Sequence, residues 1–600
     1  MPLRRTLIFA SLLMSAFSCT MSQTPPPQGS AGSERADASQ RELQKKARGL
    51  LNEVAVEARQ LRAPENRIRI QAAVADLMWE LDPAGSRMLF AQVRDDLINL
   101  IGGLNRDDPQ YDSFYYRYLQ MRREVLSRIS AHDADLALDF LRSTRQAPFD
   151  SRHFFSSHMD NELELEGTLA SQIAQRNPRR ALEIAEAGLA KGYSFPAVNL
   201  LWQLREKDPD AAATLTDDII KKIRSDNPPA DQMALNVAFG LLQMDLQRRK
   251  NTTSGPGQSK PPAPVLDDGT LQWLVEWMGN ALTGFNNTSD QAAHSMRQNM
   301  LGSYQNLLPD LEKFVPPAAS IIRTHLAQAD FSPDEQTKRW QEFNSLVAKG
   351  SVGEVLQAAA KAPPEMQYNY YQQASWKALS EDDYAQARQI IRDHISDPSQ
   401  RATMLSSLES QIVGRMMSAG KLEQARQEIY GIRSETERAK ALAQLAVIAA
   451  AQPNVKLASQ LAGEARGLLK GRIENQTQMN THLDIARSLA NLMANQAAEV
   501  LDPLPERINT LMTAAAELDP FEREQNPSFQ NGELIMQGGD FLMGIVQNFS
   551  SILGSLAQTD FDRAKSIADQ LQHLEARIEA HVEILRDVLQ PSGSSDRAGD

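Results

Sequence analysis

The feature that most constrains the fold is an internal repeat between residues 380 and 470. The segments "DDYAQARQIIRDHISDPSQRATML" and "AGKLEQARQEIYGIRSETERAKAL" align with an offset of 38 residues. The aligned positions are Ala387 with Ala425 and Ile391 with Ile429, and a third unit, "NVKLASQLAGEARGLL", adds Ala458. A small residue followed by an aliphatic one lets a helix pack closely on its neighbour. Stacked hairpins then bury the apolar surface that a single hairpin leaves exposed. The repeat therefore predicts an array of αα-hairpins.

The rest of the chain has the same helical character. From Arg41 onward apolar residues recur at steps of three and four, which is the period of an amphipathic helix. Asp-Pro and Asn-Pro pairs interrupt this pattern, and each is predicted to begin a helix with a capping oxygen followed by proline. No alternating β-branched run is bounded by hairpin turns. The sequence thus predicts an all-α fold, an irregular α-solenoid of stacked αα-hairpins.

Two of the repeat units resemble the tetratricopeptide repeat family. Gly420, Lys421 and Leu422, with the alanine and isoleucine that follow, are similar to the turn and second helix of such a repeat. Asp383, Tyr384 and the residues down to Pro398 are similar to another copy. The resemblance implies a right-handed αα-superhelix with a concave peptide-binding face. Irregular αα-hairpins of no named family are the alternative.

One Pro/Gly-rich segment, "RRKNTTSGPGQSKPPAPVLDDG", interrupts the helical pattern in the middle of the chain. Such composition is typical of a linker or a long loop. We therefore expect a solenoid in two halves, with helical repeat regions at 41–248 and 269–590, a linker at 249–268 and a disordered tail at 591–600.

The N-terminus predicts export. A cationic start is followed by the apolar run "TLIFASLLMSAF", which is shorter than the ~20 residues of a membrane span and suits a signal peptide at residues 1–19. Cys19 is the only cysteine, so an internal disulfide is excluded. Ala16, Phe17 and Ser18 before Cys19 resemble the lipobox of bacterial lipoproteins, which implies acylation of Cys19. Residues 20–40 are predicted to be a disordered tether. Plain secretion and an uncleaved anchor are the alternatives.

Composition and motifs argue against several classes of function. With 63 Lys plus Arg against 76 Asp plus Glu, the net charge is −13, so we expect no nucleic-acid partner. No Walker A loop, Gly-x-Gly-x-x-Gly, His-Glu-x-x-His or Gly-x-Ser-x-Gly is present, and no cofactor is expected. A cluster of His153, His158, Asp160 and Glu162 is the best metal candidate. Because histidines five residues apart do not share a helix face, we expect solvated or capping side chains and no metal.

Two aromatic clusters are candidate partner-binding residues. They are Tyr111, Tyr115 and Tyr118 in "YDSFYYRYL", and Tyr368, Tyr371 and Trp376 in "YNYYQQASW". Within each cluster the tyrosines are spaced to share one helix face. Core or inter-repeat packing is one interpretation, and recognition of an extended peptide or a glycan is the other.

These features together predict an exported, lipid-anchored protein of the bacterial cell envelope that acts as a helical-repeat scaffold for protein or peptide partners. It would face the periplasm or be secreted, and would touch the membrane by its N-terminal lipid only. A cell-wall or glycan hydrolase with an α-helical body is the first alternative, and a purely structural envelope element is the second. The missing catalytic motifs favour the scaffold over the enzyme.

Overall fold

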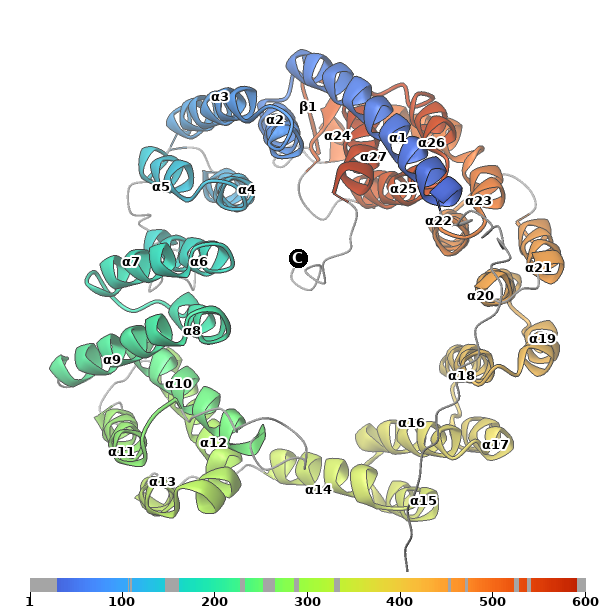
Figure 1. Ribbon diagram of the computed structural model, residues 1–600. Coiled ribbons are helices and arrows are strands. Elements are labelled where there is room, and N and C mark those ends of the chain that lie inside the picture. The colour runs from blue at the N-terminus through green and yellow to red at the C-terminus, as the bar shows by residue number, and fades with distance from the viewer. Residues whose placement is uncertain are drawn as a thin grey trace, which may run out of the picture.

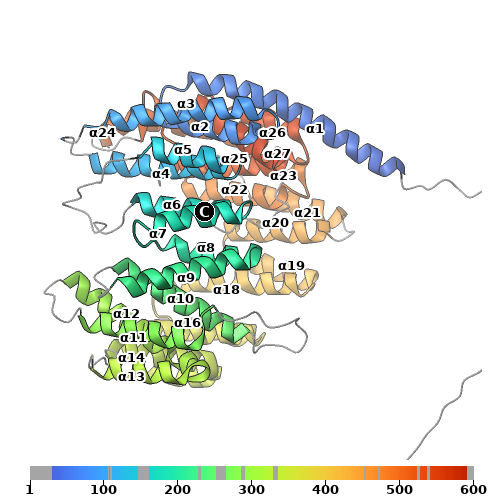
Figure 2. The ribbon, with the colours of Figure 1, turned by 60° about the vertical axis from the view of Figure 1, so that its left-hand side comes forward.

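The protein forms a ring of helices in two layers (Figure 1). The computed structural model describes residues 30–105, 107, 111–145, 161–226, 232–251, 265–284, 291–328, 335–451, 455–469, 473–522, 528–536 and 541–590. From α4 to α9 and from α16 to α23, even-numbered helices lie nearer the centre and odd-numbered helices lie outside them (Figure 1). Figure 2 shows successive rows of helices, from α1–α3 at one edge to α13 and α14 at the other. The fold is therefore an α-solenoid whose path returns to its start.

The N-terminal arc of the ring holds the following helices. They are α1 (Ser30–Glu57), the short 3-10 helix η1 (Ala58–Gln60), α2 (Pro64–Met78), α3 (Pro83–Gly102), α4 (Tyr111–Ser130), α5 (Ala134–Ser143), α6 (Asn161–Ala174), α7 (Pro178–Leu189), α8 (Pro196–Lys207), α9 (Pro209–Ser225), α10 (Gln232–Asn251), α11 (Asp268–Gly284), α12 (Gln291–Phe314) and α13 (Pro316–Gln328).

The C-terminal arc adds a small hairpin to its helices. Its elements are α14 (Glu335–Lys349), α15 (Val352–Lys361), α16 (Pro364–Ser380), α17 (Tyr384–His394), α18 (Pro398–Ser418), α19 (Leu422–Gly431), α20 (Glu435–Ala451), α21 (Val455–Gly467), α22 (Gln476–Leu489), α23 (Ala494–Leu501), α24 (Leu504–Glu522), β1 (Phe529–Gln530), β2 (Glu533–Leu534), α25 (Phe541–Ala557), α26 (Phe561–Ala568) and α27 (Leu574–Leu589).

Aspartate or asparagine followed by proline begins four helices as predicted. The capping residues are Asp82, Asn177, Asp208 and Asp397, and each side chain accepts the N–H three residues further on. The prediction is wrong for Asp519-Pro520, because Pro520 lies inside α24. The carboxylate of Asp519 instead accepts the N–H groups of Ser528 and Phe529, so it holds the chain that leads into β1.

A second repeated feature is an arginine that joins an inner helix to the end of the helix before it, and it occurs in α2, α18, α20 and α27. The donors and acceptors are Arg67 to Leu61 O, Arg401 to Ile395 O, Arg438 to Ile432 O and Arg577 to Leu571 O, at 3.1–3.4 Å. In each case an apolar residue after the outer helix is followed six positions later by the arginine. The motif occurs at both ends of the chain, so α1–α2 and α26–α27 are built like units of the central repeat.

The repeat-packing residues lie where close packing requires small or aliphatic side chains. Ala387, Ile391, Ala425 and Ile429 are 0% exposed, and Ala458 is also buried. Gly420 adopts φ +71° at the turn before α19, and Asp382 adopts φ +60° at the equivalent turn before α17. A left-handed residue there lets the next N–H reach back to the end of the preceding helix, as Lys421 does to Met416 O.

Phenylalanine in place of Ala425 should destabilise the C-terminal arc by about 1–3 kcal/mol, because the residue faces a filled helix interface. The matched control is Gln427→Phe, at an exposed position on the same helix, which should change stability little. Urea unfolding gives the free energies, and limited proteolysis locates the damage, which should stay near α18–α20. Equal losses in the two variants would mean that the other face of α19 packs.

The apolar side chains form two separate cores. One runs from Ile68 in α2 to Ile322 in α13, and the other runs from Phe343 in α14 to Val588 in α27 and includes α1. Helix α2 belongs to both, because Ile68 and Ala72 face the first core while Ile70 and Val74 face the second. Helix α2 therefore joins the two cores. We call the junction between the two ends of the chain, where α2 lies, the seam of the ring.

Two sequence-based boundaries differ from this arrangement. Helices α10 and α11, on either side of the expected linker at 249–268, share one core, and the two cores divide between α13 and α14. Most of that linker, residues 252–264, lies outside the described residues. Helix α1 begins at Ser30, inside the expected tether at 20–40, since alanine, glutamate and arginine there favour helix.

Candidate binding site at the seam of the ring

The ring closes where α1 and α2 pack against α27. Helix α1 contacts both α27 and α2, as α19 contacts both α18 and α20. Its apolar face, with Leu50, Leu51 and Val54, joins the core of the C-terminal arc. The solenoid thus continues from the end of the chain to its beginning by the same packing that joins neighbouring units.

The β1–β2 hairpin hydrogen-bonds across this junction to both ends of the chain. Asn531 and Gly532 adopt φ +53° and +79°, as the tight turn of a two-residue hairpin requires. The turn places Glu533 at the start of α2, where its carboxylate accepts the N–H groups of Arg62 at 2.7 Å and Ala63 at 3.0 Å. Glu533 therefore holds the two residues that lead into α2, some 470 residues away in sequence.

Asn66 makes a second set of hydrogen bonds across the junction. Its Nδ2 donates to Leu534 O and its Oδ1 accepts from Met536 N, both at 2.9 Å. The Leu534 N–H in turn donates to Glu575 Oε1 at the start of α27, at 3.0 Å. Asn66 is 1% exposed and Glu575 is 2% exposed, so these polar groups depend on one another. The hairpin ties the first turn of α2 to the first turn of α27.

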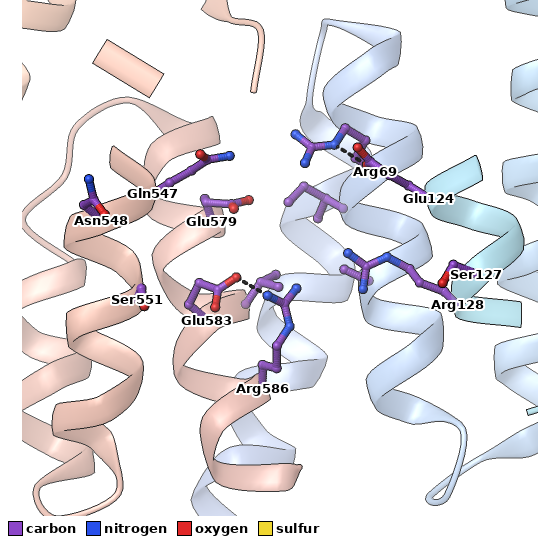
Figure 3. Close-up of a pocket in the computed structure, with 13 residues that line it drawn as sticks. Arg69, Glu124, Ser127, Arg128, Gln547, Asn548, Ser551, Glu579, Glu583 and Arg586 are labelled. Atoms are coloured by element: carbon purple, nitrogen blue, oxygen red, sulfur yellow. Dashed lines mark hydrogen bonds and ion pairs between the residues drawn. The ribbon is translucent and has the colours of Figure 1, made fainter. Parts of the chain in front are cut away.

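A pocket of about 790 Å³ lies at the seam, between four helices from both ends of the chain. Arg69, Ile70 and Ala73 come from α2; Glu124, Ser127 and Arg128 from α4; Gln547, Asn548 and Ser551 from α25; and Glu579, Val582, Glu583 and Arg586 from α27. In Figure 3 the guanidinium groups of Arg69 and Arg128 point from one wall toward the carboxylates of Glu579 and Glu583 on the other. The pocket therefore has two walls of different charge.

Each arginine in the pocket has a carboxylate partner beside it. Arg69 pairs with Glu124 at 2.9 Å, Arg128 pairs with Asp76 at 3.2 Å, and Arg586 pairs with Glu583. Glu579, by contrast, makes no hydrogen bond or ion pair with the residues that the structure describes. The wall formed by α25 and α27 thus keeps one unpaired carboxylate.

Burial shifts the pKa of two groups in the pocket. Burial lowers the pKa of Arg128, and the positive charges of Arg586 and Arg69 lower it further, against the opposing effect of Asp76. Burial also raises the pKa of Glu583, and nearby Glu579 adds to this while Arg586 opposes it. Both groups are therefore poorly solvated, and an opposite charge on a ligand would favour the charged form of each.

Asp76, the partner of Arg128, also contacts His132. Asp76 accepts from Arg128 with one oxygen, and its other oxygen lies 2.6 Å from His132 Nε2. His132 stacks on Trp79, with ring centroids 4.8 Å apart. The His132 side chain is 6% exposed and does not line the pocket, so this chain of contacts orients Arg128 and does not meet a ligand.

The aromatic clusters expected to bind partners do not form one site. The tyrosines at 111, 115 and 118 lie on α4 and the cluster of 368–376 lies on α16, on opposite sides of the ring (Figure 1). Tyr115 and Tyr118 are buried, and Tyr118 Oη donates to Glu65 Oε1 at 3.4 Å. Tyr371 is half-buried and stacks on His394 at 4.4 Å. Packing accounts for these contacts.

The remaining sequence candidates are placed as follows. Cys19, His153, His158 and Asp160 lie outside the described residues. Glu162 is neither solvated nor a helix cap but pairs with the buried Arg122. Within the described ranges no group of three His, Cys, Asp or Glu could hold a metal ion, and no helix is long and apolar enough to cross a membrane.

Sequence reasoning missed the whole pocket, because its residues come from four helices with no common motif. The one local signal near the seam was Asn531-Gly532, which favours a tight hairpin turn. The arginine six residues after an apolar position would have linked α2 with the repeat units, since the spacing is visible in the sequence.

Comparisons with known proteins give little to add. No protein-family model matches the chain, and no curated protein is similar to it. A solved structure described as a "Circular tandem repeat protein with novel repeat topology and enhanced subunit contact surfaces" matches over 91% of this chain and 99% of that one, at 12% identity and a TM-score of 0.15. A likeness at that TM-score carries no argument here.

Proposed function

We propose that the protein is an exported, lipid-anchored scaffold of the bacterial envelope that binds a peptide or protein partner at the seam of its ring. The observation that carries the proposal is the pocket itself. It combines guanidinium, carboxylate, amide and hydroxyl groups on four rigid helices, which is the mixture of donors and acceptors that polypeptide recognition uses. The resemblance of residues 380–470 to tetratricopeptide repeats supports a binding role.

The signal-like N-terminus supports the location. A lipid on Cys19 would hold the ring beside a membrane, where two or more acyl chains give stable anchoring. Helix α1 begins at Ser30, so ten residues would separate it from this anchor, and α1 is part of the seam.

In-cell photo-cross-linking tests the function. A photoreactive residue in place of Ser551, which lines the pocket, should capture peptide or protein adducts in the membrane fraction. The same residue in place of Gln427, exposed on the outer helix α19, should not. The Ser551 probe combined with Cys19→Ala should move the protein to the soluble fraction.

Three outcomes would contradict the proposal. Glycan adducts at position 551 would favour the hydrolase. Equal adducts at both positions, or none at either, would remove the support for a scaffold that binds at the seam. Full-length protein beginning at Met1 in the cytosol would contradict export.

A further inference from the structure

We infer that the seam pocket takes a short peptide whose amino and carboxyl ends are both free, and that this ligand joins the two ends of the ring. The inference rests on the proposed function and names the ligand class of the same pocket. It follows from how the charges are divided between the pocket walls, from their burial and from the origin of each wall.

The wall built by α2 and α4 is suited to a carboxylate. Arg69 and Arg128 both point into the pocket from this wall (Figure 3), and Ser127 also lines it. The single contact to Asp76 leaves other Arg128 N–H groups for a ligand. Burial and the charges of Arg586 and Arg69 lower the pKa of Arg128, so a ligand carboxylate beside this guanidinium would favour its charged form.

The facing wall is suited to an ammonium group. Glu579 and Glu583 on α27 point into the pocket, and the Gln547 side chain on α25 lies above them (Figure 3). Glu579 is half-buried and lacks a partner among the described residues. Burial and the neighbouring Glu579 raise the pKa of Glu583, while Arg586 and Arg128 oppose this. An ammonium group between the two carboxylates would favour their charged forms. The two walls therefore match the two ends of one zwitterionic ligand.

The charges of the lining favour a ligand that carries both a positive and a negative group over a simple anion or cation. The pocket is lined by three arginines and three glutamates, so its lining has no net charge. A ligand with charge of one sign would satisfy one wall and be repelled by the other. A volume of about 790 Å³ lies within the range of small-molecule sites and accommodates a peptide of a few residues.

Binding would also affect the ring, because one wall comes from residues 69–128 and the other from residues 547–586. A ligand that contacts both walls is bound only by the closed seam and stabilises closure by mass action. The β1–β2 hairpin lies at the same junction, so its backbone amides report on closure.

A random tripeptide library with free ends tests the inference, with matched libraries that are N-acetylated or C-amidated. Affinity selection on the full-length protein, read by mass spectrometry, should retain free tripeptides at least tenfold better than either capped library. The same free tripeptides should slow hydrogen exchange of residues 528–536.

Substitutions in the two walls test whether their charged residues bind the ligand. Glu579→Gln breaks no contact and should weaken binding at least tenfold, as should Arg69→Gln. Arg128→Gln should do the same if it remains folded by circular dichroism. Arg392→Gln, in a separate surface pocket on the outer helix α17, is the control and should bind normally.

The outcomes separate this inference from the proposed function. Equal retention of capped and free peptides would overturn the free-end requirement and leave peptide binding intact. Retention of no tripeptide, with protein adducts still formed at position 551, would overturn the inference while the scaffold stands. Binding that survives Glu579→Gln and Arg69→Gln would show that the ligand lies elsewhere.

Discussion

Asn66→Ala should open the ring without unfolding either arc. The substitution leaves Leu534 O and Met536 N buried without partners, and each unsatisfied group should weaken the junction by ~1–3 kcal/mol. Hydrogen exchange should accelerate by at least tenfold in α1, α2 and residues 528–536, and the radius of gyration in small-angle scattering should increase.

The control for this prediction is Asn52→Ala, an exposed asparagine on α1 that should leave exchange and size unchanged. Helices α16–α20 should keep their protection in both variants, because they belong to the packed interior of the C-terminal arc. Protection of the seam in Asn66→Ala at the level of the unaltered protein would show that apolar packing alone closes the ring.

Glu162→Ala should destabilise the N-terminal arc by about 3–5 kcal/mol, which is typical when one partner of a buried ion pair is removed. Arg122 is 0% exposed and donates to both carboxylate oxygens of Glu162, at 2.5 and 2.9 Å. Its remaining N–H groups bind Thr144 Oγ1 and Leu141 O. Without Glu162 the guanidinium stays buried with no carboxylate partner, and denaturant unfolding measures the loss.

Glu428→Ala is the matched comparison. Glu428 pairs with Arg388 between neighbouring outer helices, where both side chains are partly exposed to water. Such a pair contributes only about 0–1 kcal/mol. A similar loss in the two variants would show that burial does not decide the strength of these pairs.

The local structure could be predicted from the sequence because it depends on nearby residues. Asp397 and Pro398 begin α18 by a contact that spans three positions, and Ala387 and Ala425 show their packing role by recurring with a fixed offset. The same reasoning fails at Asp519-Pro520, where the carboxylate holds a later segment in place of a new helix. Local patterns do not show which of two competing partners a polar side chain takes.

Ring closure could not be predicted, because its contacts have no sequence period. Glu533 and Asn66 meet backbone groups of segments about 470 residues distant, and backbone groups are the same in every residue. The pocket is a consequence of closure, so Arg128 and Glu579 are unremarkable surface charges in the sequence. Glu162 was assigned to solvent because its partner, 40 residues earlier, lies on another helix.

The seam affects the order in which the chain folds during synthesis. Hairpins of the central repeat find their neighbours within about 40 residues and can fold as they emerge, but the apolar face of α1 is covered by helices near residue 588. A chain that leaves the ribosome or crosses a membrane N-terminus first exposes Leu50, Leu51 and Val54 until its last helix arrives. Helix α1 is thus made before the helices that cover it. Until then its exposed apolar face could aggregate, unless a chaperone or a membrane surface covers it.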